Sequence, residues 1–235
     1  MNLDLRPSAV TKIQAGFILL VALSLIVSQA NAVSGAAFEV RVQVKLFELR
    51  AGESLKDYSG VAVWLVPLRT VLPAGLNSEL PHYRLIQRNK TFEPHLLVVP
   101  VGSIVEFQNR DPWVHNAFSL FDGVGFDLGP ERPGVQKAVR FDHAGVIYVF
   151  CGLHPQMGAV VLAIESPYFG VADKTGHISI GNVPPGTYSL HVWYENAAWQ
   201  ALKGLRPVIV LGNTHRRTPT IFITLAKQVP INSEN

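Results

Sequence analysis

The strongest constraint on the fold is an alternation of apolar and polar residues that recurs along most of the chain. It is clearest from Phe38 to Phe47, where Val40, Val42 and Val44 are separated by charged or polar side chains. A period of two is typical of a β-strand with one buried and one solvent-facing side. No segment after residue 32 has a convincing helical period. The sequence therefore predicts an all-β protein.

Clusters of glycine, proline, asparagine and aspartate separate these alternating segments and supply turn geometry, as in the stretches 109–112, 129–134 and 182–186. Many short strands joined by turns favour antiparallel sandwiches or barrels. Besides 38–47, the pattern predicts strands at 61–66, 95–99, 104–108, 135–141, 146–150, 159–164, 177–180, 188–194, 206–211 and 220–225.

A change in composition near Ser166 predicts the end of one β module and the start of another. We expect two modules, at about 38–165 and about 167–228. The stretch before residue 91 is open to two interpretations, because it could supply extra strands to the first module or form a small unit of its own. We interpret 76–88 as an irregular polar connection. The predicted organisation is 1–32 signal peptide, 33–90 N-terminal β segment, 91–165 first domain, 166–228 second sandwich and 229–235 tail.

The N-terminus has the pattern of a secretory signal peptide. Arg6 and Lys12 precede an apolar run, and Ala30 and Ala32 provide the small residues that signal peptidase requires, which predicts cleavage after Ala32. The alternative is an uncleaved anchor, although the run is shorter than the roughly 20 residues that cross a bilayer as a helix. We therefore expect a periplasmic or secreted protein.

Composition and charge exclude several classes of protein. A 48% hydrophobic and 16% charged composition indicates a folded chain. The formal charge of +3 carries no lysine or arginine run, so nucleic-acid binding has no support. Cys151 is the single cysteine, which excludes an intramolecular disulfide. In an oxidising compartment its thiol is either buried and inert or bound to a metal.

The segment from Tyr148 to Met157 favours the metal. A predicted strand ends at Cys151, and His154 and Met157 follow at intervals of three residues. Thiolate, imidazole and thioether are soft donors, and two nitrogens and one sulfur with a weak axial thioether are how proteins hold an electron-transfer copper. Zinc is an alternative, although it has no use for a thioether.

A fourth ligand has to come from another strand end, and His115 offers it. His115 follows the predicted strand 104–108, and a sandwich brings distant strand ends together. We expect the neighbouring Asn116 to hydrogen-bond to the Cys151 loop and hold it in place.

Together, Asn109, Asp111, His115-Asn116 and Cys151-x-x-His154-x-x-Met157 resemble the cupredoxins, in particular the short-loop type represented by amicyanin, with plastocyanin and pseudoazurin more distant. The resemblance covers about 91–165. It implies a Greek-key β-sandwich that binds one type 1 copper ion through His115, Cys151, His154 and Met157.

The stretch 176–193 resembles the small transthyretin-like sandwiches of the carboxypeptidase-regulatory kind, which are generally structural. The whole layout is similar to secreted bacterial plastocyanin-like proteins often labelled methylamine-utilisation proteins. We therefore expect an all-β chain with a cupredoxin sandwich and a small C-terminal transthyretin-like sandwich.

The leading functional hypothesis is an exported one-electron carrier between redox protein partners, and not an enzyme. Alternatives are copper storage or delivery, the electron-entry domain of a copper oxidase or nitrite reductase, and a purely structural sandwich. Trp113 and Phe118 flank His115 and could form an apolar collar for a partner. Among the other histidines, His143 precedes the cysteine strand and could lie near the site or at the far end of the sheet.

Overall fold

The computed structural model describes residues 37–48, 57–69, 82–120, 125–197, 202, 206–212 and 220–227. The signal peptide expected at 1–32 and the tail expected at 229–235 lie outside the described residues. Every element named within the described ranges is a β-strand, and the strands form four sheets, so the protein is an all-β sandwich fold as predicted. No helix in these ranges is long and apolar enough to cross a membrane.

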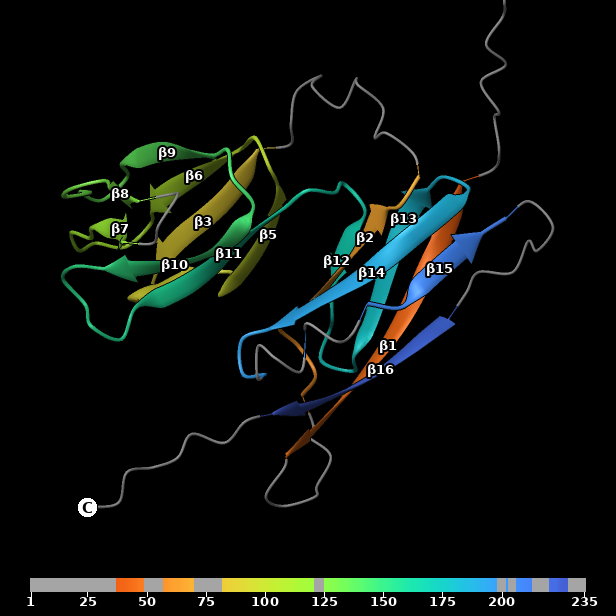
Figure 1. Ribbon diagram of the computed structural model, residues 1–235. Coiled ribbons are helices and arrows are strands. Elements are labelled where there is room, and N and C mark those ends of the chain that lie inside the picture. Colours follow the sequence, from red (N-terminus) through yellow and green to blue (C-terminus); the bar gives the residue numbers. More distant parts are fainter. Residues whose placement is uncertain are drawn as a thin grey trace, which may run out of the picture. The chain divides into compact units, whose positions relative to one another are not determined.

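The strands from both ends of the chain form one sandwich, which we call the terminal sandwich (Figure 1). One sheet has the order β13-β1-β16 and the other β12-β2-β14-β15. Its strands are β1 (Phe38–Glu48), β2 (Val61–Pro67), β12 (Phe169–Val171), β13 (His177–Val183), β14 (Gly186–Tyr194), β15 (Val208–Leu211) and β16 (Thr220–Lys227).

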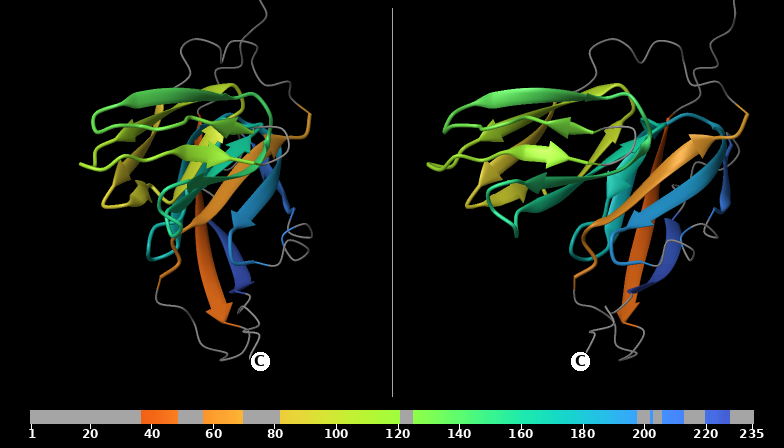
Figure 2. Two further views of the ribbon diagram at one scale, coloured as in Figure 1. Left: turned by 90° about the vertical axis from the view of Figure 1, so that its left-hand side faces the viewer. Right: turned by 60° about the vertical axis from the view of Figure 1, so that its left-hand side comes forward.

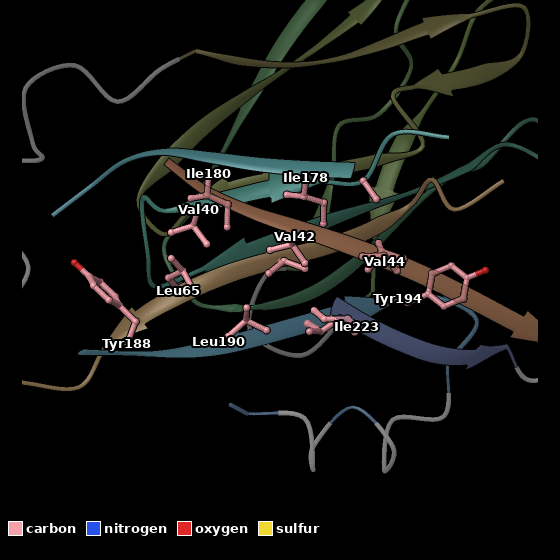
Figure 3. Packing of buried hydrophobic residues seen from close by; sticks show 14 of the residues in the cluster. Val40, Val42, Val44, Leu65, Ile178, Ile180, Tyr188, Leu190, Tyr194 and Ile223 are labelled. Atoms are coloured by element: carbon pink, nitrogen blue, oxygen red, sulfur yellow. The ribbon is translucent and has the colours of Figure 1, made fainter. Parts of the chain in front are cut away.

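The alternation that predicts the first strand also builds the core of the terminal sandwich. Val40, Val42 and Val44 of β1 are fully or almost fully buried, whereas the adjacent Glu39 and Arg41 are exposed. Figure 3 shows these valines lying among side chains of β2, β13, β14 and β16. The N-terminal strands therefore complete a sandwich whose other strands come from the C-terminal part of the chain.

This pairing differs from both interpretations of the N-terminal β segment. β1 runs parallel to β16, with Arg41 opposite Thr220, and antiparallel to β13, whereas β2 pairs with β14 and β12. Figure 2 shows β1, in orange, beside β16, in blue, in both of its views. Strand partners so far apart in the chain leave no local signal in the sequence.

The middle of the chain forms the second sandwich, which we call the central sandwich. Its sheets have the orders β5-β11-β10-β7-β8 and β4-β3-β6-β9, and they enclose their own hydrophobic core. Its strands are β3 (Tyr83–Arg88), β4 (Thr91–Glu93), β5 (Leu96–Pro100), β6 (Ser103–Asn109), β7 (Ala117–Ser119), β8 (Phe126–Asp127), β9 (Gln136–Phe141), β10 (Gly145–Cys151) and β11 (Gly158–Ile164).

One prediction from the sequence is wrong in this sandwich. The stretch 76–88 is not an irregular connection throughout, because 83–88 is the strand β3, paired with both β4 and β6. Leu85 and Gln87 are fully buried between the more exposed Arg84 and Arg88. Because Gln87 faces inward in place of an apolar residue, the segment lacks the apolar and polar alternation that predicts a strand. Residues 76–81 lie outside the described ranges.

Candidate metal centre

Cys151 ends β10 on the face that points into the central sandwich. Ile147 and Val149 precede it at intervals of two and are buried, and Cys151 itself is 5% exposed. The neighbouring strand β7 pairs Ala117 with Cys151. This register brings the residues just before β7, including His115, to the same end of the sheet. The sheet therefore fixes the backbone on both sides of the thiol.

Backbone hydrogen bonds fold the segment after Cys151 into a tight loop. The Cys151 amide donates to the Met157 carbonyl at 3.0 Å, and the Met157 amide donates to the His154 carbonyl at 2.9 Å. The Gly152 amide donates to the Asn116 carbonyl at 3.0 Å and so attaches the loop to the β7 side. As a result the ring of His154 turns back toward the thiol, and Met157 is buried at the base of the loop.

Three donor atoms converge at this point. The Cys151 sulfur lies 3.6 Å from Nδ1 of His115 and 3.5 Å from Nδ1 of His154, and the two nitrogens are 3.1 Å apart. The point equidistant from these atoms is about 2 Å from each, close to the lengths of metal–nitrogen and metal–sulfur bonds. The triangle is therefore the right size for one metal ion.

Asp111 fixes the orientation of the His115 ring. Its Oδ2 lies 2.8 Å from Nε2 of His115, and both side chains are buried. A carboxylate only accepts hydrogen bonds at neutral pH, so Nε2 carries the proton and Nδ1 keeps its lone pair. That lone pair faces the Cys151 sulfur and the His154 nitrogen. Electron-rich atoms brought together in this way favour a cation between them.

The pKa of His154 is lowered from its ordinary value. Burial of the ring is the main cause, because it disfavours the charged form, and the nearby His115 and Lys90 act in the same direction against a smaller opposing effect of Asp111. A neutral imidazole is the form that binds metals. His154 is also only half-buried, so it is the donor that reaches the protein surface.

Asp111 also holds the tight turn between β3 and β4. Its two oxygens accept hydrogen bonds from the amides of Asn89, at 2.6 Å, and Lys90, at 2.9 Å. Both residues have the left-handed backbone, with φ of 53° and 56°. Burial of Asp111 alone would raise its pKa, but these amides and His115 outweigh that effect, so the pKa is lowered. One carboxylate thus connects a strained turn to His115.

A second buried carboxyl group, Glu131, supports the other side of His115. The two residues exchange backbone hydrogen bonds, and the Glu131 Oε2 accepts from Nε2 of Gln87 at 2.9 Å and from the Ala117 amide at 3.1 Å. Glu131 is 0% exposed and its Oε1 has no hydrogen-bond partner among the described residues. Burial raises its pKa, against smaller opposing effects of these donors.

We expect Glu131→Gln to leave stability unchanged or to raise it, because the amide oxygen can still accept from Gln87 and Ala117 while the buried charge is removed. Glu131→Ala, in contrast, should cost about 2–3 kcal/mol, because both donors lose their acceptor. Denaturant unfolding measures both effects. A carboxyl group whose pKa is raised by folding loses stability as the pH rises through that pKa. The advantage of the glutamine variant should therefore be larger at pH 8 than at pH 5, and a glutamine variant as unstable as the alanine variant would contradict the interpretation.

The structure brings together three of the predicted ligands, His115, Cys151 and His154, in the described residues' one cluster of metal-ligating side chains. Met157 is 1% exposed and closes the same loop. Asn116 meets the loop through its backbone carbonyl, and its side-chain Oδ1 is buried without a hydrogen-bond partner. A role for Asn116 and the axial role of Met157 stay predictions.

The other two sequence expectations concern the surroundings. His143 lies in the turn that precedes β10, at the opposite end of this strand from Cys151. Trp113 is 47% exposed, whereas Phe118 is only partly exposed and packs against Phe150, with ring centroids 6.1 Å apart. His143 is therefore far from the cluster, and Trp113 contributes more than Phe118 to the surface beside it.

Sequence reasoning gave no role to the two buried carboxyl groups. Asp111 precedes His115 by four residues, and an acidic residue close before a metal-binding histidine is a signal that could have found it. Glu131 meets His115 through an isolated β-bridge between distant segments, so no local sequence pattern predicts a role for Glu131.

The donor set fits copper. Thiolate, imidazole and thioether are soft or borderline ligands, and a trigonal set of two histidines and one cysteine with a methionine close by is typical of copper electron-transfer sites. The residues that would hold the ion are His115, Cys151 and His154, with Met157 in the same loop. A bound copper ion there would supply a one-electron couple between Cu(I) and Cu(II).

Comparison with known proteins gives partial structural likenesses. No family model matches the chain, and no curated protein matches it. A purple cupredoxin from Nitrosopumilus maritimus is 24% identical with a TM-score of 0.33, over 35% of this chain and 99% of that one. A reduced tryptophan-to-tyrosine mutant of amicyanin is 22% identical with a TM-score of 0.34, over 35% of this chain and 82% of that one. The copper-containing nitrite reductase of Thermus scotoductus SA-01 is 23% identical with a TM-score of 0.36, over 43% of this chain and 26% of that one.

Proposed function

We propose that this chain is an exported type 1 copper protein that carries one electron at a time between redox partner proteins. The observation that supports this most is the convergence of the Cys151 sulfur with Nδ1 of His115 and of His154. A thiolate in a trigonal set with two imidazoles couples strongly to copper. The proposal assigns the ion, one copper per chain, and the ligand role of Met157.

The rigidity of the cluster supports electron transfer. Cys151 is fixed by β10, His115 by Asp111 and the backbone bridge to Glu131, and His154 by the closed loop. Ligands held this firmly change little between the oxidised and reduced states. Little reorganisation as the charge moves means a low barrier to electron transfer.

His154 is the route by which we propose that the electron leaves the site. It is the half-buried member of the cluster, and its loop neighbour Leu153 is 55% exposed. Trp113 and Val114, next to His115 in the chain, are exposed as well. A partly accessible ligand among exposed apolar side chains lets a partner approach closely while the rest of the cluster stays dry. Export to the periplasm or beyond is part of the proposal and is supported by the sequence of residues 1–32.

The test is to add one equivalent of Cu(II) to the chain lacking residues 1–32 and to record visible and electron paramagnetic resonance spectra, followed by cyclic voltammetry. We expect an intense thiolate-to-copper absorption and a reversible one-electron wave. A protein that binds Cu(I) exchangeably without a coloured Cu(II) form would instead favour copper storage or delivery. Absence of the absorption in a folded, copper-loaded sample would refute the proposal.

Met157→Leu should keep the colour and raise the reduction potential. Leucine fills a similar volume but offers no sulfur. A thioether donor stabilises Cu(II) more than it stabilises Cu(I), so its loss raises the reduction potential. Val149→Ala changes the same core without removing a donor, and it should leave the potential close to that of the wild type. Voltammetry of the three proteins under one set of conditions gives the comparison. Equal potentials for wild type and Met157→Leu would show that Met157 is not a ligand.

A further inference from the structure

Three loops meet around His115 at one end of the central sandwich. The Arg110 amide donates to the Gln87 carbonyl at 2.9 Å, which joins the loop after β6 to the end of β3. The amide of Asn109 donates to the carbonyl of Val135, and the amide of Gly134 donates to the carbonyl of Asn109, both at 2.9 Å. The turn 88–90, the loop 110–116 and the loop 129–135 therefore lie side by side around the metal-ligand cluster.

The charged side chains of these loops are sorted by sign. Arg88, Lys90, Arg110 and Arg132 are all exposed. The carboxyl groups of the same loops, Asp111 and Glu131, are 4% and 0% exposed, and both point into the network around His115. The end of the sandwich that carries the cluster therefore presents cations to solvent and keeps its carboxyl groups inside.

Exposed carboxylates near these loops do not cancel the positive charge. Glu93 lies 3.7 Å from Arg88 and offsets only this one cation. Asp127, on β8, accepts a hydrogen bond from the Gly129 amide. Lys90, Arg110 and Arg132 form no ion pair with any described residue, so their charges face outward. We call these three residues the cationic rim.

The cationic rim adjoins an apolar centre, by which we mean the exposed side chains of Trp113 and Leu153. The ammonium group of Lys90 lies 4.7 Å from the centroid of the Trp113 ring, which places a charge directly beside the exposed indole. An apolar centre with a charged, solvent-accessible border has the anatomy of a transient protein interface.

We propose that the cationic rim and the apolar centre form the docking face for a redox protein with an acidic surface around its own redox centre. This inference rests on the proposed electron-carrier function and adds the charge of the partner. Opposite charges would steer the partner to His154 and raise the association rate, and like-charged proteins would be turned away. Trp113 and Leu153 would supply the close contact that excludes water at the point of electron transfer.

Stopped-flow oxidation of the Cu(I) protein by two small reagents of opposite charge tests the sign of this face. With hexacyanoferrate(III), an anion, the second-order rate should fall as ionic strength rises from about 0.01 M to about 0.3 M. With tris(phenanthroline)cobalt(III), a cation, it should rise. Equal salt dependences for the two reagents would overturn the proposal.

A pair of triple variants locates the effect. Lys90→Glu with Arg110→Glu and Arg132→Glu reverses the cationic rim. Arg41→Glu with Arg140→Glu and Lys174→Glu makes the same change in net charge on exposed residues outside the three loops. At low salt the rim variant should react with hexacyanoferrate(III) at least about tenfold more slowly than the control variant. Equal rates for the two variants would show that only net charge matters and would contradict a docking face.

Binding of poly-L-glutamate, followed by calorimetry on the metal-free chain, tests the acidic-partner inference independently of copper. Wild type and control variant should bind it in a salt-dependent way and the rim variant should not. Binding that is equal for rim and control variants would refute the proposal, even if the visible spectrum supports a copper carrier. Vesicles of phosphatidylcholine with phosphatidylglycerol serve as a second probe. Capture of wild type but not of the rim variant by these vesicles, without poly-L-glutamate binding, would identify a lipid surface as the occupant and overturn the protein partner.

Discussion

Replacing Cys151 by serine should abolish the visible colour of the Cu(II) protein and weaken copper binding by more than about a hundredfold. The sulfur is one corner of the donor triangle, at 3.6 Å and 3.5 Å from the two imidazole nitrogens, so its loss leaves two nitrogens and a distorted site. A hydroxyl group stays protonated at neutral pH and is a poor ligand for copper. The expected protein is folded and colourless.

The comparison needs a variant that removes a metal-binding side chain elsewhere. His143→Ala suits this purpose, because His143 is exposed in the turn at the other end of β10. We expect it to retain the colour and the affinity of the wild type in a competition assay with a copper chelator. Circular dichroism checks that serine at position 151 leaves the sheets intact. A coloured Cys151→Ser protein would exclude the thiolate as a ligand.

Asp111→Ala should destabilise the central sandwich by about 3–5 kcal/mol, the largest effect on stability that we expect from one polar substitution. The carboxylate accepts hydrogen bonds from the amides of Asn89 and Lys90 and from Nε2 of His115, all of them within a buried network. Alanine leaves these donors without an acceptor and removes what holds the left-handed turn. Denaturant unfolding of the metal-free protein measures the loss.

Two further variants separate charge from shape. Asp111→Asn keeps one acceptor oxygen and should lose roughly half as much stability as alanine, while its copper affinity should fall by about 10–100-fold, because His115 is no longer held in one tautomer. Asp142→Asn removes an exposed carboxylate that pairs with Arg140 and should change the free energy of unfolding by less than about 1 kcal/mol. A loss at Asp111 no larger than at Asp142 would show that the carboxylate is not structural.

The sequence was most informative where the structure is local. The all-β class follows from a period of two, and that period is visible in the burial of Val40, Val42 and Val44. The loop from Cys151 to Met157 is equally local, because its residues are joined by hydrogen bonds within seven positions. Both features could be predicted because the chemistry that forms them lies in one short segment.

Features that depend on tertiary packing were less visible. β3 was missed because the buried Gln87 stands where a strand usually has an apolar residue. Gln87 can be buried because it donates a hydrogen bond to Glu131, which lies far from it in the sequence. His115 could be proposed only from its place after a predicted strand, because its contact with the Cys151 loop spans 36 positions, and Glu131 was not found at all. The order of strands in the terminal sandwich also depends on contacts between distant segments, since β1 pairs with residues from 177 onward.

The parallel pairing of β1 with β16 has a consequence for how the chain becomes folded. The strands of the central sandwich lie between β2 and β12 in the sequence. The central sandwich can therefore form as soon as the chain has been synthesised to residue 164. β1, in contrast, must wait for β13, which begins at His177, and its pairing is complete only with β16, whose first paired residue is Thr220. Contacts between such distant segments are slow to form. The metal-ligand cluster can therefore form before β1 has both of its partners, and the chain could take up metal while its terminal sandwich is still incomplete.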